Sequence, residues 1–200
     1  YDIMKRHAKK ALLVGNIEIP YTGYALESDK DSVTVAEISS FQLETMVTFK
    51  PHVTAILNIT PDHLDRHKTL ENYIAIKESI TKNQDENDFC VLNYNDPVLR
   101  EFGKTPRCKV IFFSSSEELE SGVFLRGDTM IIKENGVETP VCTTKDTSLV
   151  GMHNYENIMA AIAMTHAMGV PLDTIRQGIK EFTAVEHRIE FVTEKNGVKY

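Results

Sequence analysis

The chain has 200 residues, of which 42% are hydrophobic and 26% are charged, a composition typical of a globular protein with one sizeable core. Its 10 glycines, 7 prolines and 3 cysteines are too few for a collagen-like chain, a disordered chain or a disulfide scaffold. The 29 acidic and 22 basic residues leave a net charge of −7, which argues against nucleic-acid binding, because such binding depends on cations that neutralise phosphates.

Apolar runs alternate with amphipathic segments along the chain. The first 10 residues are compatible with a helix that ends in basic residues. The clearest amphipathic helix spans residues 69–83, and two further helices are expected over residues 154–168 and 172–182. Buried strands are expected at residues 11–15, 32–37, 52–58, 88–93 and 109–113.

This alternation predicts an α/β fold, in which a mostly parallel sheet is flanked by helices on both faces. Between residues 122 and 142 the pattern changes to short strands separated by turn signals, which predicts a small antiparallel meander at the edge of the sheet. Residues 189–200 place Asn196-Gly197 between two β-rich arms, which predicts a hairpin. A second domain is expected to begin near this hairpin.

The cysteines and the apolar runs indicate where the protein works. Cys90, Cys108 and Cys142 are odd in number and form no CxxC pair, which predicts free thiols. The apolar runs are far shorter than the roughly 20 residues of a membrane-spanning helix, and the first residues lack the apolar stretch of a signal peptide. We therefore expect a cytoplasmic protein without a membrane span.

Polar side chains follow two of the expected strands. Glu37 ends the first of them, and the segment NITPDHLD, residues 58–65, follows the second. Ligands of open α/β sheets gather at the carboxyl ends of the strands, so these side chains are expected to share one crevice. Carboxylates and hydroxyls suit a hard cation such as Mg²⁺, and Glu37 and His63 are the candidate functional residues.

A structural role stays open for the same segments. Ser39 and Ser40 can cap the helix that follows them, and Asp62 and Asp65 can cap or solvate a loop. A metal-dependent hydrolase built on Glu37, His63 and Asp65 is an alternative of another class.

Four further features have simple alternatives. His63 and His67 lie four residues apart, which on a helix could bind zinc, but no third zinc ligand is obvious. Lys77, taken alone, is most simply a solvated helix residue. Asn154 and Asn157 lie three residues apart on one expected helix face, where they could contact a nucleotide or where one could be the N-cap. Arg188, taken alone, is a surface arginine.

Taken together, these segments resemble the Mur ligases, the ATP-dependent enzymes of peptidoglycan precursor synthesis. The SSFQLE run favours the branch that adds D-glutamate to UDP-N-acetylmuramoyl-L-alanine over the sister ligases and the folylpolyglutamate synthases, which remain the alternative. The resemblance covers almost the whole chain and is carried by Gly15-Asn16, EISSFQLE at residues 37–44, ILNITPDHLDRH at residues 56–67, Lys77, HNYEN at residues 153–157 and EHR at residues 186–188.

The resemblance implies a reaction in which ATP phosphorylates the L-alanyl carboxylate and the amine of D-glutamate attacks the acyl phosphate to form an amide. Mg²⁺ would offset the repulsion between the anionic reactants. By resemblance, Glu37 and His63 would be metal ligands, with His63 also near the alanyl carboxylate. Lys77 would be carbamylated, because a carbamate is an anionic oxygen ligand whereas an ammonium repels the metal.

The remaining roles concern the nucleotide and the sugar substrate. By resemblance, Asn154, Asn157 and Arg188 would hold the nucleotide, and Asn16 would lie along the pyrophosphate of the substrate. Where the family usually reads GNIG, this chain has Glu18 after Ile17, which adds a negative charge near an anionic substrate.

The resemblance also implies a domain division. Residues 1–184 would be the central ATP-binding domain, and residues 185–200 would begin the C-terminal amino-acid-binding domain. None of the 10 glycines lies in a GxxxxGK[ST] phosphate loop, which the family places just before Tyr1. These 200 residues alone are therefore expected to be inactive or to act only as a noncatalytic nucleotide-binding module.

Overall fold

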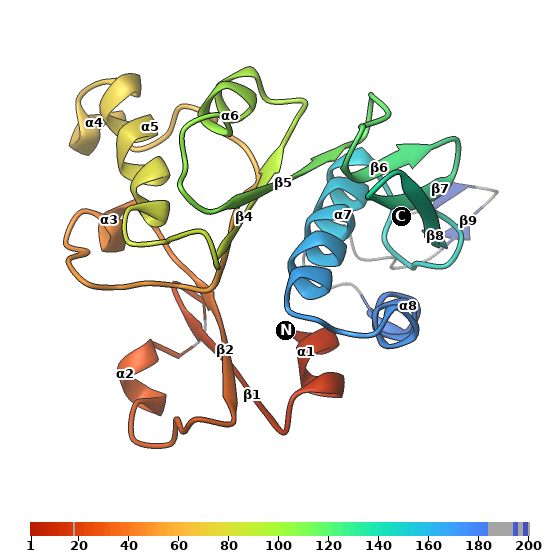
Figure 1. The fold of residues 1–200 in the computed structure, drawn as a ribbon, viewed down its shortest axis with the longest axis horizontal. Coiled ribbons are helices and arrows are strands. Elements are labelled where there is room, and N and C mark those ends of the chain that lie inside the picture. The colour runs from red at the N-terminus through yellow and green to blue at the C-terminus, as the bar shows by residue number, and fades with distance from the viewer. Residues whose placement is uncertain (18, 184–193, 196–197, 200) are drawn as a thin grey trace.

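The computed structural model describes residues 1–17, 19–183, 194–195 and 198–199, and these residues form an α/β fold (Figure 1). The strands are β1 Lys10–Gly15, β2 Ser32–Glu37, β3 Val53–Ile56, β4 Phe89–Asn93, β5 Lys109–Ser114, β6 Gly122–Arg126, β7 Thr129–Glu134, β8 Val137–Thr143, β9 Glu194–Lys195 and β10 Val198–Lys199. The helices are α1 Asp2–His7, α2 Tyr21–Tyr24, α3 Ser40–Leu43, α4 Leu64–His67, α5 Leu70–Glu78, α6 Pro97–Phe102, α7 Met152–Ala167 and α8 Leu172–Glu181, and α5 continues into the 3-10 turn Ser79–Thr81.

The main sheet has six strands in the order β3-β4-β5-β6-β7-β8. Strands β3 to β6 pair in parallel, and β6, β7 and β8 pair antiparallel. The turns between β6, β7 and β8 fall at Gly127 and Gly136, both of which have a positive φ angle. This arrangement confirms the predicted mostly parallel sheet with an antiparallel meander at its edge.

Strands β1 and β2 form a separate parallel pair, in register from Lys10 opposite Ser32 to Gly15 opposite Glu37. Strand β1 buries Leu12 and Val14, but no residue of β2 is fully buried. The prediction of a buried strand at residues 32–37 is therefore wrong in that respect. Val33 and Val35 pack against the main core and are only partly buried, whereas Thr34 and Ala36, on the other face of β2, are exposed.

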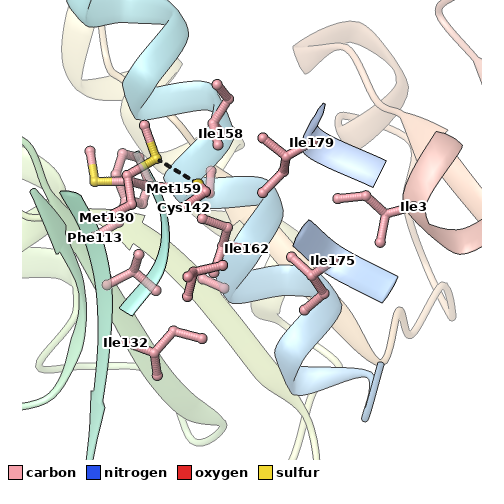
Figure 2. Packing of buried hydrophobic residues seen from close by; sticks show 14 of the residues in the cluster. Ile3, Phe113, Met130, Ile132, Cys142, Ile158, Met159, Ile162, Ile175 and Ile179 are labelled. Atoms are coloured by element: carbon pink, nitrogen blue, oxygen red, sulfur yellow. Dashed lines mark hydrogen bonds between the residues drawn. The ribbon is translucent and has the colours of Figure 1, made fainter. Parts of the chain in front are cut away.

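Helix α7 covers one face of the main sheet and contacts β3, β4, β5 and β6 (Figure 1). It begins at Met152 after the N-cap Gly151, two residues earlier than predicted. The completely buried Ile162 illustrates the stabilisation here, since burying such a side chain contributes roughly 1.5 to 3 kcal/mol. Figure 2 shows side chains of the sheet, α7, α8 and α1 meeting in this core, among them Phe113, Met130, Ile158, Ile162, Ile175 and Ile3.

Helix α6 lies against the opposite face of the sheet, where Leu99 and Phe102 pack with Leu92. This short helix was not predicted, although Asp96 and Pro97 are typical start signals. Asp96 Oδ1 accepts hydrogen bonds from the backbone N–H groups of Val98 and Leu99. Helices therefore cover both faces of the sheet, as predicted.

Several smaller features of the structure bear on the sequence-based expectations. Helix α5 and its 3-10 turn occupy residues 70–81 of the predicted helix 69–83, and Thr69 caps the helix through Asn72 N. The three cysteines are free and buried. None of the helices that the structure describes is both long and apolar enough to cross a membrane. Strands β9 and β10 pair antiparallel, as the predicted hairpin requires, while its turn at Asn196-Gly197 lies outside the described residues.

Candidate functional site

The carboxyl ends of β1 and β2 bring Asn16 and Glu37 together. Asn16 Nδ2 donates a hydrogen bond to Glu37 Oε1 at 3.0 Å, and Asn16 N donates to Glu37 O at 2.7 Å. Gly15 makes this approach possible, because a Cβ atom there would lie 2.0 Å from Glu37 O, and its φ of +111° is one that side chains rarely permit. Two of the predicted site residues are thus in direct contact.

The segment after Glu37 forms the short helix α3. Ser39 is its N-cap in a capping box, since Ser39 Oγ accepts from Gln42 N and Gln42 Oε1 accepts from Ser39 N. The capping role that the sequence left open for Ser39 is therefore confirmed. Ser40 instead points into the interior, where its Oγ lies 3.0 Å from His67 Nε2.

His63 lies at the start of α4, on the loop that follows β3. It is the N-cap of the helix and has a left-handed backbone, with φ at 51°, an uncommon conformation for a residue other than glycine. Asp62 Oδ1 accepts from His63 N at 2.8 Å, and Asp62 Oδ2 lies 3.4 Å from His63 Nε2. Half of the His63 side chain is exposed, so the imidazole is available to a ligand.

The structure does not support a zinc pair of His63 and His67. His63 precedes the helix and is exposed, whereas His67 is buried and faces Ser40. Among the described residues, no three His, Cys, Asp or Glu side chains gather into a metal-binding group. The same finding leaves the hydrolase trio of Glu37, His63 and Asp65 without an assembled metal site.

Lys77 lies on the last turn of α5 and is partly buried rather than simply solvated. Its Nζ is 4.9 Å from the centre of the Tyr73 ring and 3.5 Å from Asn58 O, near the start of the loop that leads from β3 to His63. The two partners place a cation beside a π face and a carbonyl oxygen. Lys77 therefore faces the same loop that carries His63.

The start of α7 carries Asn154 and Asn157. Asn154 Nδ2 donates to Val150 O at 2.8 Å, and Asn157 is exposed. Gly151 is the N-cap of this helix, so the alternative in which one of these asparagines is the N-cap is wrong. The segment of Glu186, His187 and Arg188 lies outside the described residues.

A polar network that the sequence did not predict lies between α7 and the carboxyl ends of β4 and β5. Glu156 accepts hydrogen bonds from Ser115 Oγ at 2.6 Å, Asn95 Nδ2 at 3.2 Å and Asn93 Nδ2 at 3.4 Å. Asn93 also donates to Leu57 O at 3.1 Å, at the end of β3. The position of Asn93 at the end of a strand was the available signal, and the network ties the first turns of α7 to the sheet edge.

A groove of about 540 Å³ opens beside helices α3, α4 and α5. Residues of α4 and α5 and of the segments that follow α3 and α5 form its walls. Its polar lining includes Glu44, Arg66, His67, Lys68 and Lys82.

The ligand atoms that Glu37, His63 and Lys77 offer decide how well this site suits Mg²⁺. Glu37 offers a carboxylate and His63 an imidazole, and both side chains are exposed. A hard divalent cation prefers oxygen ligands and a negative donor set, which one carboxylate supplies only in part. The set fits Mg²⁺ if Lys77, which faces the same loop, supplies an anionic oxygen, as a lysine carbamate would.

Comparison with known proteins gives consistent results. The family model "Mur ligase middle domain" matches residues 1–165. UDP-N-acetylmuramoylalanine--D-glutamate ligase of Lachnoclostridium phytofermentans is 51% identical over 199 residues, which are 100% of this chain and 44% of that protein. The protein of the same name from Lachnospira eligens is 48% identical with the same coverage. The chain thus spans less than half the length of these relatives.

Solved structures are similar in fold. MurF from Acinetobacter baumannii is 20% identical, with a TM-score of 0.72 over 96% of this chain and 44% of that one. The MurF ligase from Thermotoga maritima in complex with ADP is 19% identical, with a TM-score of 0.69 over 100% of this chain and 48% of that one. At these identities the structures support the fold alone.

Proposed function

Because the chain belongs to the Mur ligase family, we propose that the protein containing it is an ATP-dependent ligase that adds D-glutamate to UDP-N-acetylmuramoyl-L-alanine in the synthesis of peptidoglycan precursors. The observation that carries this proposal is the 51% identity, over 199 residues, to a relative named for that reaction. In the proposed reaction ATP phosphorylates the L-alanyl carboxylate, and the amine of D-glutamate displaces phosphate from the acyl phosphate to form the amide.

Glu37 and His63 would hold Mg²⁺, together with Lys77 as a carbamate. Bound there, Mg²⁺ would offset the repulsion between the substrate carboxylate and the triphosphate. The contact of Asn16 with Glu37 supports this assignment, because the amide fixes one carboxylate oxygen and leaves the other free. His63 would also lie near the alanyl carboxylate, and the exposure of half of its side chain leaves the imidazole accessible to that group.

Carbamylation of Lys77 requires a neutral amine that attacks CO₂, with release of one proton. The partial burial of Lys77 and its place beside the loop of His63 support this modification. The product is an anion, which no longer gains from the Tyr73 ring face. The modified side chain is therefore expected to leave the ring and turn toward the metal.

The proposal assigns the other residues to substrate binding. Asn154, Asn157 and Arg188 would hold the nucleotide, and Asn16 would lie along the pyrophosphate of the sugar substrate. Residues 1–184 would form the central ATP-binding domain, and residues 185–200 would begin the amino-acid-binding domain. The protein would work in the cytoplasm, where nucleotide-linked precursors and ATP are available.

The test uses the full-length protein with ATP, Mg²⁺ and UDP-N-acetylmuramoyl-L-alanine. D-Glutamate, L-lysine, meso-diaminopimelate and L-alanine are supplied separately, and amide product and ADP are both measured. We expect product with D-glutamate and little with the other three amino acids. Equal or better turnover with another amino acid would assign the protein to a sister ligase.

A further inference from the structure

The imidazole of His67 is completely buried among α3, α4 and α5. Its Nε2 forms a hydrogen bond with Ser40 Oγ at 3.0 Å. Its Nδ1 lies 3.2 Å from Glu44 Oε1, and among the described residues this contact is not aligned as a hydrogen bond. Burying an imidazole is costly unless its nitrogens face polar groups. Both partners come from the segment that directly follows Glu37, so His67 joins the loop after β3 to the loop after β2.

The Glu44 carboxylate that faces His67 is itself held in place. Arg66 Nε lies 3.2 Å from each oxygen of Glu44, and Arg66 Nη2 donates to Oε2, which makes a bidentate pair. The same guanidinium lies 4.9 Å from the centre of the Phe41 ring. Helix α4 is thus attached to the α3 segment through two neighbouring residues, one buried and one exposed.

A series of ring contacts passes through His67 and connects two of the proposed site residues. The Phe41 ring lies 4.9 Å from the His63 ring and 5.5 Å from the His67 ring. The Tyr73 ring lies 5.4 Å from the His67 ring, and Lys77 Nζ lies 4.9 Å from Tyr73. These separations are those of favourable aromatic and cation–π pairs. His67 is the middle member of the series, and its main-chain oxygen also accepts from Asn72 Nδ2 of α5 at 3.1 Å.

We propose that His67 is a positioning residue for the candidate metal site. Its imidazole fixes α3, α4 and α5 relative to one another, and with them the three side chains Glu37, His63 and Lys77. The roles of those three side chains rest on the proposed function, whereas their relative placement is a property of the fold. His67 itself touches no reacting group in this arrangement.

The test uses two variants of the full-length protein and one matched control. His67→Phe keeps an aromatic ring and removes both nitrogens, and His67→Gln keeps hydrogen-bonding groups and removes the ring. The control is Gln84→Ala. Gln84 is equally buried and bonds Thr54, Pro51 O and Phe89 O near the amino ends of β3 and β4.

Three quantities are measured for each protein: the melting temperature, the amide hydrogen exchange of residues 39–44 and 63–68, and the affinity for Mn²⁺ by electron paramagnetic resonance. We expect His67→Phe and His67→Gln to speed exchange in both segments together. Mn²⁺ binding should weaken about 10-fold to 100-fold, the range found when residues supporting metal ligands are replaced. Gln84→Ala should lower the melting temperature while leaving Mn²⁺ affinity and exchange in the two segments unchanged.

Unchanged Mn²⁺ affinity or unchanged amide exchange in both His67 variants would overturn the inference. An equal loss of Mn²⁺ affinity in Gln84→Ala would also overturn it, because it would indicate general destabilisation. A wild-type protein that binds no Mn²⁺ would overturn it too, because there would be no metal site to position. Failure of the proposed function gives a different result, namely wild-type protein that binds Mn²⁺ and depends on His67 but does not use D-glutamate.

Discussion

Asn16 and Glu37 meet side by side where β1 and β2 end, joined by one side-chain hydrogen bond of 3.0 Å and one backbone hydrogen bond of 2.7 Å. The resemblance to Mur ligases assigned them to different tasks, Asn16 to the pyrophosphate and Glu37 to the metal. Their contact means that a shift of either residue moves the other. The relationship depends on Gly15, the partner of Glu37 in the strand register.

We therefore predict that Gly15→Ala destabilises the fold and displaces Glu37. The new Cβ would lie 2.0 Å from Glu37 O, and the φ of +111° is unfavourable for alanine. A strained backbone of this kind costs about 1 to 3 kcal/mol before the clash is counted. Urea denaturation measures the change, and Gly127→Ala is the control, because its φ is +62° and no atom lies within 4 Å of the new Cβ. Equal losses of stability in the two variants would show that the clash with Glu37 O contributes nothing.

The fold was largely predictable from local patterns. Apolar runs predicted the strands β1, β3, β4 and β5, and Gly-containing turns predicted the β6–β8 meander, because both signals come from neighbouring residues. The burial of β2 was not predictable in this way. It depends on which elements pack on the two faces of the strand, which periodicity does not specify.

The site was predicted residue by residue but not as an arrangement. The contact of Ser40 with His67 spans 27 positions in the sequence, and that of Asn93 with Glu156 spans 63. Helical spacing shows which face of one element a residue occupies, whereas the opposing residue is set by tertiary packing. For this reason the spacing of His63 and His67 suggests zinc, and Glu156 does not stand out between Asn154 and Asn157.

The carbamate proposed for Lys77 gives the second prediction. In the full-length protein, Lys77→Ala should nearly abolish amide formation, and added short carboxylic acids should partly restore it by replacing the missing carbamate oxygens. Lys77→Arg should stay inactive, since a guanidinium remains cationic and forms no carbamate under these conditions. The control is Lys82→Ala, a nearby exposed lysine at the groove. Full activity of Lys77→Arg would remove the carbamate from the mechanism.

The third prediction concerns acid stability at the amino ends of β3 and β4. Lys50 donates to Asp85 and lies 3.2 Å from Asp88, and the hydrogen bond from Lys50 is the main cause that lowers the pKa of Asp85 from 3.8 to about 2. A carboxyl group whose pKa is lower in the folded state stabilises the fold above its unfolded pKa, and this stabilisation is lost as the pH falls through the folded pKa. The contribution of Asp85 should therefore disappear between about pH 4 and pH 2.

Lys50→Met tests this assignment through the free energy of unfolding in urea at pH 5, 4, 3 and 2. The variant should be less stable than the wild type at pH 5, and the difference should shrink toward pH 2. Lys104→Met is the control, because Lys104 is an exposed lysine whose ion pair is with Glu101 of α6 and not with Asp85 or Asp88. A difference that stays constant from pH 5 to pH 2 would show that Lys50 acts through packing rather than through Asp85.

The last prediction concerns Glu156, which joins α7 to the ends of β4 and β5. In Glu156→Ala the donors of Asn93, Asn95 and Ser115 lose an acceptor, and a buried donor left unsatisfied costs about 1 to 3 kcal/mol. Glu156→Gln should recover only part of this loss, because its amide group turns two new donors toward a cluster that already consists of donors.

The same substitution should also affect the nucleotide, since Asn154 and Asn157 lie on the first turns of α7 that Glu156 attaches to the sheet. For Glu156→Gln in the full-length protein we expect the KM for ATP to rise more than kcat falls. Glu134→Ala is the control, because Glu134 is an exposed residue of β7 whose carboxylate lies 3.3 Å from His166 Nε2, at the far end of α7. The stability of the Glu134→Ala protein should change by less than about 0.5 kcal/mol, as for most surface substitutions, and its KM for ATP should not change. If Glu156→Gln loses stability while its KM for ATP stays at the wild-type value, the network supports the fold but does not position the asparagines, and the nucleotide is then held by other residues.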